Sequence, residues 1–240
     1  MTAYKDDLAY VHDVGFGYFA RGATPWLLDT LRRRGITEGL VVDLGCGSGL
    51  WARALVDAGY DVLGIDLSAA MIDLARTRVP EATFRTASVF QAALPPCRAV
   101  TALGEIFNYL FDAANAFGEL GRLFRRVFDA LQPGGLLIFD IAEPGRGRGP
   151  RQRHFEGDDW AILTEYEEDT TTHQLTRRIV TFRKVDGCYR RDEENHRLQL
   201  YQGTDVAAAL RRVGFRVRTV RGYGQQRFPK AYVGFIARKP

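Results

Sequence analysis

The sequence predicts a doubly wound α/β fold: a mostly parallel seven-stranded sheet that ends in an antiparallel C-terminal strand and carries an antiparallel β flap as an insertion. Short apolar runs alternate with amphipathic stretches of helical length from Leu40 to Asp140. A turn with three alternate glycines follows the first apolar run, and longer, more polar strand-like stretches fill residues 160–201. Because strands that alternate with helices pair in parallel through right-handed crossovers, the first part should form one open sheet.

The expected strands of the main sheet are short apolar segments, and helical segments with one apolar face separate them. We expect strands at residues 40–43, 61–66, 83–86, 99–103, 136–140, 215–220 and 232–237. Helices are expected at residues 50–58, from Ser68 onward, at 113–131 and at 204–214. The first forty residues also read as helices. One of these should start at Thr24-Pro25, a capping hydroxyl followed by proline in the first turn.

The segment between the fifth strand and the last helix should form the flap. Residues 160–168, 175–185 and 188–201 are predicted as three long strands of mixed polarity, and Asp186-Gly187 is typical of a two-residue hairpin turn. The segment is too long for a loop and too poor in apolar residues to form a core of its own. We therefore expect it to lie over the main sheet and to depend on that packing.

The composition is that of an ordinary globular protein. Of 240 residues, 46% are hydrophobic and 26% charged, which argues against disordered and fibrous classes. The net charge of +4 is small, and Lys and Arg are interspersed with Asp and Glu. The arginines in residues 146–154 are interpreted as part of a solvated loop. This pattern argues against a nucleic-acid partner. No apolar run approaches the ~20 residues of a membrane helix, so no membrane association is expected.

The cysteines and the N-terminal segment bear on the compartment and on metals. Cys46, Cys97 and Cys188 are widely spaced and form no C-x-x-C pair. The N-terminal segment lacks the basic-then-apolar order of a secretory signal. We expect reduced thiols and a cytoplasmic protein, present as a monomer or a homodimer. No metal is expected, because metal-ligand motifs such as H-E-x-x-H are missing from the sequence.

The glycine-rich turn carries the chemical signal. Gly45, Gly47 and Gly49 lie between a strand and a helix, where they allow a tight turn and close approach of a ligand. The positive end of the following helix favours an anionic group in this turn. Asp66 ends the second strand about twenty residues later, where a carboxylate can accept hydrogen bonds from both hydroxyls of a ribose. Dinucleotide-binding proteins share these features.

Three segments, in the expected order, resemble motifs of class I S-adenosylmethionine-dependent methyltransferases. They are Asp43-Leu-Gly45-Cys-Gly47-Ser-Gly49, Gly64-Ile-Asp66-Leu-Ser68-Ala-Ala-Met71, and Leu131-Gln-Pro133-Gly134-Gly135-Leu-Leu-Ile-Phe139-Asp140. The flap is similar to that of the small-molecule branch of this family. The resemblance implies the cofactor S-adenosyl-L-methionine and the product S-adenosyl-L-homocysteine. It also implies one domain, 1–240, with a helical lid (1–35), a Rossmann-like core (36–145 and 204–240) and a flap over the acceptor site (146–203).

The resemblance also assigns residues to the cofactor. Those implied to line the cofactor site are Asp43, Gly45, Cys46, Gly47, Asp66, Leu67, Met71, Ser88, Val89, Phe90, Leu103 and Gly104. Asp66 would bind the ribose, and Leu67 and Met71 would pack near the adenine. At the position of Ser88 the family often has an acid that contacts the adenine amino group. A hydroxyl stands there in this chain.

Candidate acceptor-side residues follow the fourth strand and lie on the flap. Glu105, Asn108 and Tyr109 are expected to face the substrate, and Glu105 could remove a proton or hold a substrate cation. His196, on a flap strand, is a second candidate base. His12, in the lid, is a further candidate for substrate binding.

The function expected from these features is methyl transfer to a small soluble acceptor through a nitrogen or oxygen nucleophile. The alternatives are an RNA or protein methyltransferase, a nicotinamide-dependent oxidoreductase that shares the strand, glycine turn and acid, and a cofactor-binding regulatory protein. The fourth strand ends in Gly104-Glu-Ile-Phe-Asn108-Tyr. The Asn/Asp-Pro-Pro-Tyr sequence of base-amine methylating enzymes is different, which favours a small acceptor.

Overall fold

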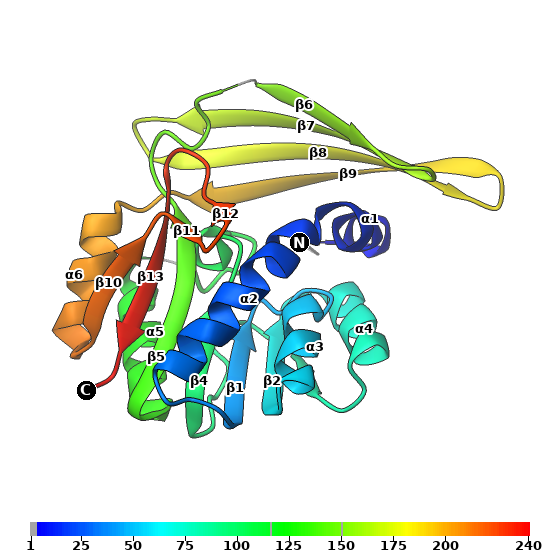
Figure 1. Ribbon diagram of the computed structural model, residues 1–240. Helices are drawn as coiled ribbons and strands as arrows, with labels where there is room; N and C mark the ends of the chain where they lie inside the picture. The colour runs from blue at the N-terminus through cyan, green and yellow to red at the C-terminus, as the bar shows by residue number, and fades with distance from the viewer. Residues whose placement is uncertain (1–3, 116, 150) are drawn as a thin grey trace.

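The computed structural model describes residues 4–115, 117–149 and 151–240, so the first three residues of the predicted lid and one residue each of the predicted 113–131 helix and flap lie outside it. The main sheet has seven strands in the order β10-β13-β5-β4-β1-β2-β3. Their bounds are β1 (Gly39–Leu44), β2 (Tyr60–Asp66), β3 (Thr83–Thr86), β4 (Cys97–Ala102), β5 (Leu131–Ala142), β10 (Arg216–Val220) and β13 (Tyr232–Arg238). A second sheet arches over it (Figure 1). The predicted fold class is confirmed.

The direction of the strands follows the prediction. β1 pairs in parallel with both β2 and β4, and β4 pairs in parallel with β5. β13 lies antiparallel between β5 and β10 and so closes the sheet with the expected C-terminal pair. Because helices cover both faces, the central strands are buried on both sides and read as continuous apolar runs rather than as alternating patterns.

Helices sort onto the two faces by the alternation of side chains along the strands. On one face, Val42 and Phe139 pack with α5 (Phe117–Ala130) and α6 (Gly203–Val213). On the other face, Val41 packs with α2 (Tyr18–Arg33), α3 (Leu50–Asp57) and α4 (Ala69–Arg78) (Figure 1). Within the described ranges, no helix combines the length and apolarity that a bilayer crossing requires.

The flap is an antiparallel sheet of four strands, one more than predicted. They are β6 (Gln152–Glu156), β7 (Trp160–Asp169), β8 (Gln174–Val185) and β9 (Cys188–Gln199). The added strand, β6, falls in the arginine-rich stretch interpreted as a loop. All five of its residues are exposed, so no apolar alternation marks it in the sequence. Asp186 and Gly187 form the predicted hairpin turn, both with positive φ, as a two-residue turn of this kind requires.

The flap is held by α1 (Asp6–Phe16), by the loop after β4 and by the ends of β5 and β13 of the main sheet. Leu8 and Val11 of α1 pack against Trp160, Ile162 and Ile179 of the flap. A second apolar contact joins β9 to the loop after β4, where Tyr109 bridges to Leu198. Leu175 and Leu198 of the flap pack with Ala142 of β5 and Tyr232 of β13, so the flap contacts the main sheet as expected. The dependence of flap stability on this packing stays a prediction.

Two helices start at positions that differ from the prediction. α2 begins at Tyr18 and runs through Thr24 and Pro25, because the Thr24 hydroxyl bonds back to the carbonyl of Ala20 instead of capping a new helix. α5 begins at residue 117 instead of 113. The carboxylate of Asp112 accepts the amide of Ala114 and so forms a turn before the helix.

Asp140, at the carboxyl end of β5, joins several distant segments. Its fully buried carboxylate accepts the backbone amides of Gly104 and Glu105 at 2.9 and 2.7 Å. It also accepts the hydroxyls of Tyr223, on β11 (Gly222–Tyr223), and of Tyr232, on β13. Burial raises the pKa of Asp140 to about 6 despite these donors. The C-terminal strands and the loop after β4 thus meet at one carboxylate.

Asp140→Asn should destabilise the protein by about 2–4 kcal/mol, because an amide NH₂ would face donors that then lack an acceptor in a buried site. Tyr223→Phe, which removes one donor and leaves the others paired, should cost only about 1 kcal/mol. Urea unfolding above pH 7, where Asp140 is ionised, measures both. Equal unfolding midpoints for Asp140→Asn and the wild type would contradict the role given to this carboxylate.

Candidate active site

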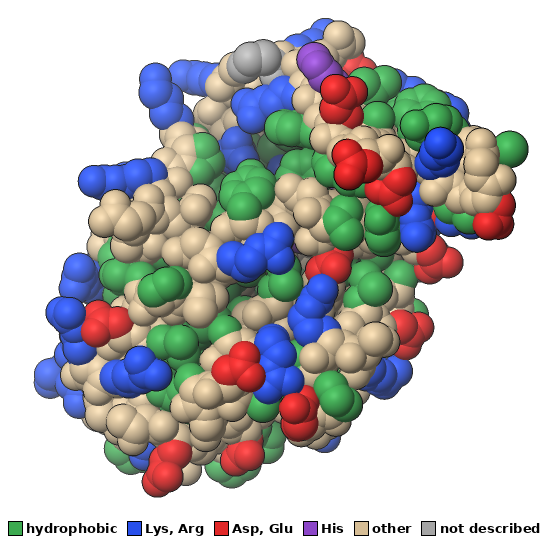
Figure 2. All heavy atoms as spheres, turned by 45° about the vertical axis from the view of Figure 1, so that its right-hand side comes forward, with side chains coloured by type: hydrophobic (Ala, Val, Ile, Leu, Met, Phe, Trp, Pro, Cys, Tyr) green, Lys and Arg blue, Asp and Glu red, His purple; other side chains and the backbone are tan. Residues whose placement is uncertain are grey.

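A cavity of about 370 Å³ lies at the carboxyl ends of the central strands, beneath the flap. This is the edge at which open α/β sheets bind ligands. Figure 2 shows hydrophobic side chains at the junction between flap and core, with basic and acidic side chains intermixed over this face. Of the residues predicted for the cofactor, those that line the cavity are Asp43, Gly45, Cys46, Gly47, Asp66, Leu67, Met71, Val89, Phe90, Leu103 and Gly104.

The glycine turn after β1 forms one wall. Gly45 and Gly47 both have positive φ, and the amides of Gly45 and Cys46 donate to the carbonyl of Ile65. A Cβ on Gly45 would collide with Ile106, whereas positions 47 and 104 face open space. The backbone can therefore approach a ligand closely at Gly47 and Gly104.

Asp66 lies at the end of β2 and is partly buried. One oxygen accepts the amide of Gly47 and the other that of Ser68, each at 2.9 Å. Burial raises its pKa, and these amides oppose the rise. Each oxygen keeps a second lone pair, which matches the two hydroxyls of a ribose.

Asp43 lies near the end of β1, just before the glycine turn. It accepts the hydroxyl of Thr101 at 2.7 Å, and Thr101 in turn accepts the indole N–H of Trp51. Burial raises the pKa of Asp43 to about 7. This chain of hydrogen bonds fixes β1, β4 and α3 relative to one another.

Asp112 is a cavity residue that sequence reasoning missed. The predicted Ser88 does not line the cavity; its hydroxyl donates to Asp112 at 2.5 Å and accepts the amide of Phe90. Asp112 lines the cavity together with Phe90 and Val89. An acid is thus present near the position where the sequence offers only a hydroxyl. Because it comes from a loop 24 residues further on, no local motif identifies it.

Glu105 forms the centre of the other end of the cavity. It has a positive φ of 56°, and its amide is bound by Asp140. One carboxylate oxygen accepts Arg177 of β8 at 2.6 Å, and Arg177 also donates to the hydroxyl of Tyr109 at 3.2 Å. The other oxygen, Oε2, is buried and accepts no hydrogen bond from the described residues. Tyr109 lines the cavity as expected, and Arg146 and Arg177 line it without having been predicted.

Tyr4 and His12 are polar residues that the N-terminal segment contributes to the cavity beside apolar ones such as Leu8 and Phe16. Tyr4 lines it, and its hydroxyl lies 3.1 Å from that of Tyr109. His12, predicted for substrate binding, also lines it, with its ring 5.3 Å from that of Tyr4. Burial lowers the pKa of His12 to about 4, so its imidazole is neutral at pH 7. Tyr4 was missed because no sequence pattern places the fourth residue beneath a flap.

Besides Ser88, two predicted residues of the acceptor side, Asn108 and His196, do not line the cavity. Asn108 donates to the carbonyls of Ala142 and Gln199 and accepts the amide of Ala142, so it joins β5 to β9. His196 is buried, with its Nε2 atom 2.9 Å from Glu194. These contacts give Asn108 and His196 a structural role. The catalytic role of His196 stays a prediction.

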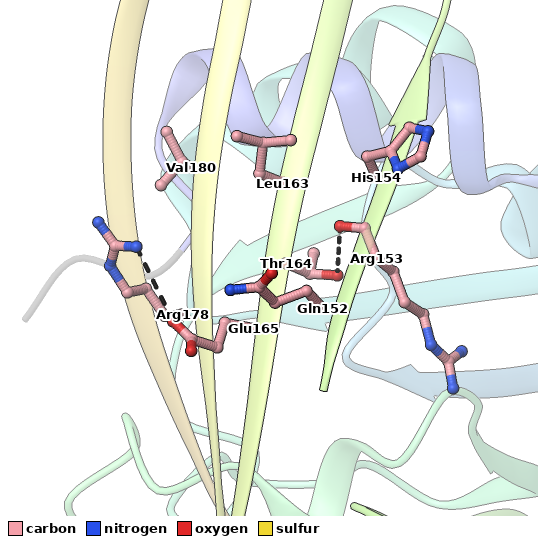
Figure 3. A pocket seen from close by; sticks show the side chains of 8 residues that line it. All are labelled: Gln152, Arg153, His154, Leu163, Thr164, Glu165, Arg178 and Val180. Carbon is pink, nitrogen blue, oxygen red and sulfur yellow. Dashed lines mark hydrogen bonds and ion pairs between the residues drawn. The ribbon is translucent and has the colours of Figure 1, made fainter. Parts of the chain in front are cut away.

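A second hollow, of about 420 Å³, lies on the flap among β6, β7 and β8. Figure 3 shows Leu163 and Val180 beside the ion pair of Glu165 with Arg178, while the side chain of Arg153 extends away from that pair. It lacks the strand ends and the glycine turn that give the first cavity its chemistry. Within the described segments, no cluster of side chains suits a metal ion.

Residues 41–135 match the family described as methyltransferase domain, which spans β1, the glycine turn, Asp66 and the start of β5. A protein of Geobacillus sp. (strain WCH70) whose name designates it a methyltransferase is 27% identical over 194 residues, 74% of each chain. Several other curated relatives match over less than half of their own length. The part of the chain that holds the glycine turn and Asp66 is therefore similar to methyltransferase domains.

Solved structures show the same fold. An S-adenosylmethionine-dependent methyltransferase from Clostridium acetobutylicum superposes with a TM-score of 0.82 at 17% identity, covering 96% of this chain and 97% of that one. The sugar N-methyltransferase KedS8 from Streptoalloteichus sp. gives a TM-score of 0.80 at 22% identity, covering 100% and 96%. At these identities the likeness establishes the fold.

The cofactor of this chain is S-adenosylmethionine, and the residues present fit it. Gly47 and Gly104 leave the open space that a bound nucleoside and amino acid need. Asp66 retains free lone pairs for a diol, and apolar Leu67, Met71 and Phe90 line the cavity beyond it.

Asp66→Ala should weaken binding of S-adenosylhomocysteine by about 1.5–3 kcal/mol, the usual contribution of hydrogen bonds to a charged group. Because Asp66 also accepts the amides of Gly47 and Ser68, some loss of stability without ligand is expected as well. Asp61→Asn, at an exposed position of the same strand, is the matched control. Titration calorimetry showing equal affinity for Asp66→Ala and the control would refute the ribose assignment.

His12 should make stability depend on pH. An unfolded imidazole has a pKa of about 6.5, whereas burial lowers that of His12 to about 4. Between these values the unfolded chain binds more protons, so this contribution to stability is complete above pH 6.5 and is lost as pH falls toward 4. The wild type should therefore lose stability relative to His12→Gln across this window in urea unfolding. A difference that stays constant with pH would show that His12 titrates normally.

Proposed function

We propose that the chain transfers the methyl group of S-adenosylmethionine to a small soluble acceptor through a nitrogen or oxygen nucleophile. The observation that carries this proposal is one cavity with two different ends. Asp66 and the glycine turn lie at one end, and Glu105, Tyr109 and Arg177 lie beneath the flap at the other. The volume of about 370 Å³ suits small molecules. The structural neighbour KedS8, named as a sugar N-methyltransferase, supports the same class of acceptor.

When bound, S-adenosylmethionine would supply an electrophilic methyl group for a lone pair of the acceptor. The protein then has to align the acceptor and exclude water, and positioning supplies much of such an acceleration. Glu105 is suited to orient the nucleophile, because its Oε2 atom is buried and free to accept an N–H or O–H. Arg177 fixes the other oxygen of Glu105 and so sets the direction of Oε2.

The acceptor should reach the cavity as a small molecule rather than as part of a polymer. The flap covers the acceptor end, and α1 packs beneath it. The arginines of the described flap face several partners: Arg178 pairs with Glu193, Arg183 with Asp7 and Arg177 with Glu105. This pattern gives no continuous basic track for a nucleic-acid backbone.

Two measurements test the proposal directly. Thermal shift with S-adenosylhomocysteine should raise the melting temperature, whereas NAD should not, since a ligand stabilises only what binds it. Methyl transfer should then be found in a screen of small amines, hydroxyls and sugars by following formation of S-adenosylhomocysteine. Stabilisation by NAD alone would favour the oxidoreductase alternative. Transfer confined to RNA or protein substrates would refute the small acceptor.

Asp112 should recognise the adenine amino group in place of the acid that Ser88 replaces. Asp112→Asn should reduce the preference for S-adenosylhomocysteine over S-inosylhomocysteine, which carries an oxygen in place of that amino group, by about tenfold. Asp57→Asn, at a surface position that pairs with Arg53, is the control. Competition binding with both nucleosides gives the ratio. An unchanged ratio in Asp112→Asn would remove this residue from the adenine site.

A further inference from the structure

Arg146 is a partly buried cation to which the described residues offer no hydrogen bond. It follows β5, lines the cavity, and has a side chain only 18% exposed. Its guanidinium makes no hydrogen bond to any residue the structure describes, and its Nε atom is buried without a partner. The nearest opposite charge is Glu105 Oε2, 3.6 Å from Nε, which is beyond hydrogen-bonding distance. The guanidinium also lies over the ring of Tyr232.

Three other arginines that are partly withdrawn from solvent, Arg78, Arg126 and Arg177, have hydrogen-bond partners. Arg177 donates to Glu105 and Tyr109. Arg78 donates to Asp13, and Arg126 donates to backbone carbonyls. A buried charge without hydrogen bonds is costly, so proteins normally pair it. The contrast indicates that the partner of Arg146 is a ligand.

The charge at the acceptor end also favours an anion. Arg146, Arg153 and Arg177 line the cavity, and Glu105 lies against Arg146 and Arg177. Asp112 also lines the cavity, where it accepts the hydroxyl of Ser88. Asp43 and Asp66 lie apart from the arginines, at the strand ends beside the glycine turn. A planar guanidinium matches the two oxygens of a carboxylate or phosphate in a way that a hydroxyl or an amine cannot.

We propose that the acceptor carries an oxyanion bound by Arg146, next to an N–H or O–H group that faces Glu105 Oε2. This inference rests on the proposed methyl transfer and names its substrate class. The two protein groups are only 3.6 Å apart, so the oxyanion and the nucleophile must lie close together on the acceptor. A small α-amino or α-hydroxy acid meets this requirement, and a phosphorylated small molecule shares its oxyanion chemistry. A neutral sugar would leave Arg146 unpaired.

The test uses the full chain saturated with S-adenosylhomocysteine. The probes are glycine, alanine, phenylalanine and lactate, each paired with its amide, together with inorganic phosphate, followed by saturation-transfer NMR titration. At least one acid should bind at least about tenfold more tightly than its amide, the usual effect of a charge-assisted hydrogen bond. Arg146→Gln should remove this preference and leave the affinity for S-adenosylhomocysteine unchanged. Arg148→Gln, on the same loop and outside the cavity lining, should keep it.

The outcomes separate this inference from the proposed function. If S-adenosylhomocysteine binds but no acid is preferred over its amide and phosphate does not bind, the oxyanion site is refuted while the proposed function stands. If Arg146→Gln and Arg148→Gln lose the preference for the acid over its amide to the same extent, the oxyanion site is also refuted. Such a loss would reflect the net charge of the protein alone. Phosphate binding that depends on Arg146, without binding of the acids, would support the oxyanion site and assign it to phosphorylated acceptors. If S-adenosylhomocysteine itself does not bind, the proposed function fails.

Discussion

The carboxylate of Asp140 is the interaction on which the shape of the acceptor end depends. It is fully buried and accepts two amides of the loop after β4 and two tyrosine hydroxyls from the C-terminal strands. The amides it binds are those of Gly104 and Glu105, both of which have positive φ. A backbone in this conformation persists only when its surroundings hold it. The C-terminal antiparallel strands, which contribute no residue to the glycine turn, therefore help to fix the direction in which Glu105 points.

Backbone groups form most of one end of the cavity, and side chains form the other. The glycine turn, with its open space at Gly47, and the backbone amides around Asp66 form one end. Side chains from distant segments form the other: Glu105 after β4, Arg146 after β5 and Arg177 on β8. Backbone geometry tolerates little sequence variation, whereas side chains on a flap can change without altering the fold. The construction separates a constant cofactor end from an acceptor end that can be specialised.

This division explains what the sequence could predict. The positions of the main-sheet strands and the residues of the glycine turn were predictable, because periodicity and glycine spacing are local signals. Ser88 and Asp112 were not, since a hydroxyl and a carboxylate from separate loops meet only in the folded chain. Arg146 was interpreted as part of a solvated loop because nothing nearby marks it as buried. β6 was missed for the related reason that an exposed edge strand shows no apolar alternation.

The N-terminal segment links the two ends through Glu194. One oxygen of this carboxylate accepts the amide of Lys5, and the other accepts that of Tyr4, both at 2.8 Å. The carbonyl of Tyr4 in turn accepts the hydroxyl of Ser68, which caps the helix after Asp66. His196 lies 2.9 Å from the same Glu194 and packs against the ring of Tyr4. These contacts favour a positioning role for His196, since it orients the carboxylate that ties the flap to the cofactor end. Tyr4 lines the cavity and His196 does not. If His196 served as a base, it would therefore have to act through Tyr4.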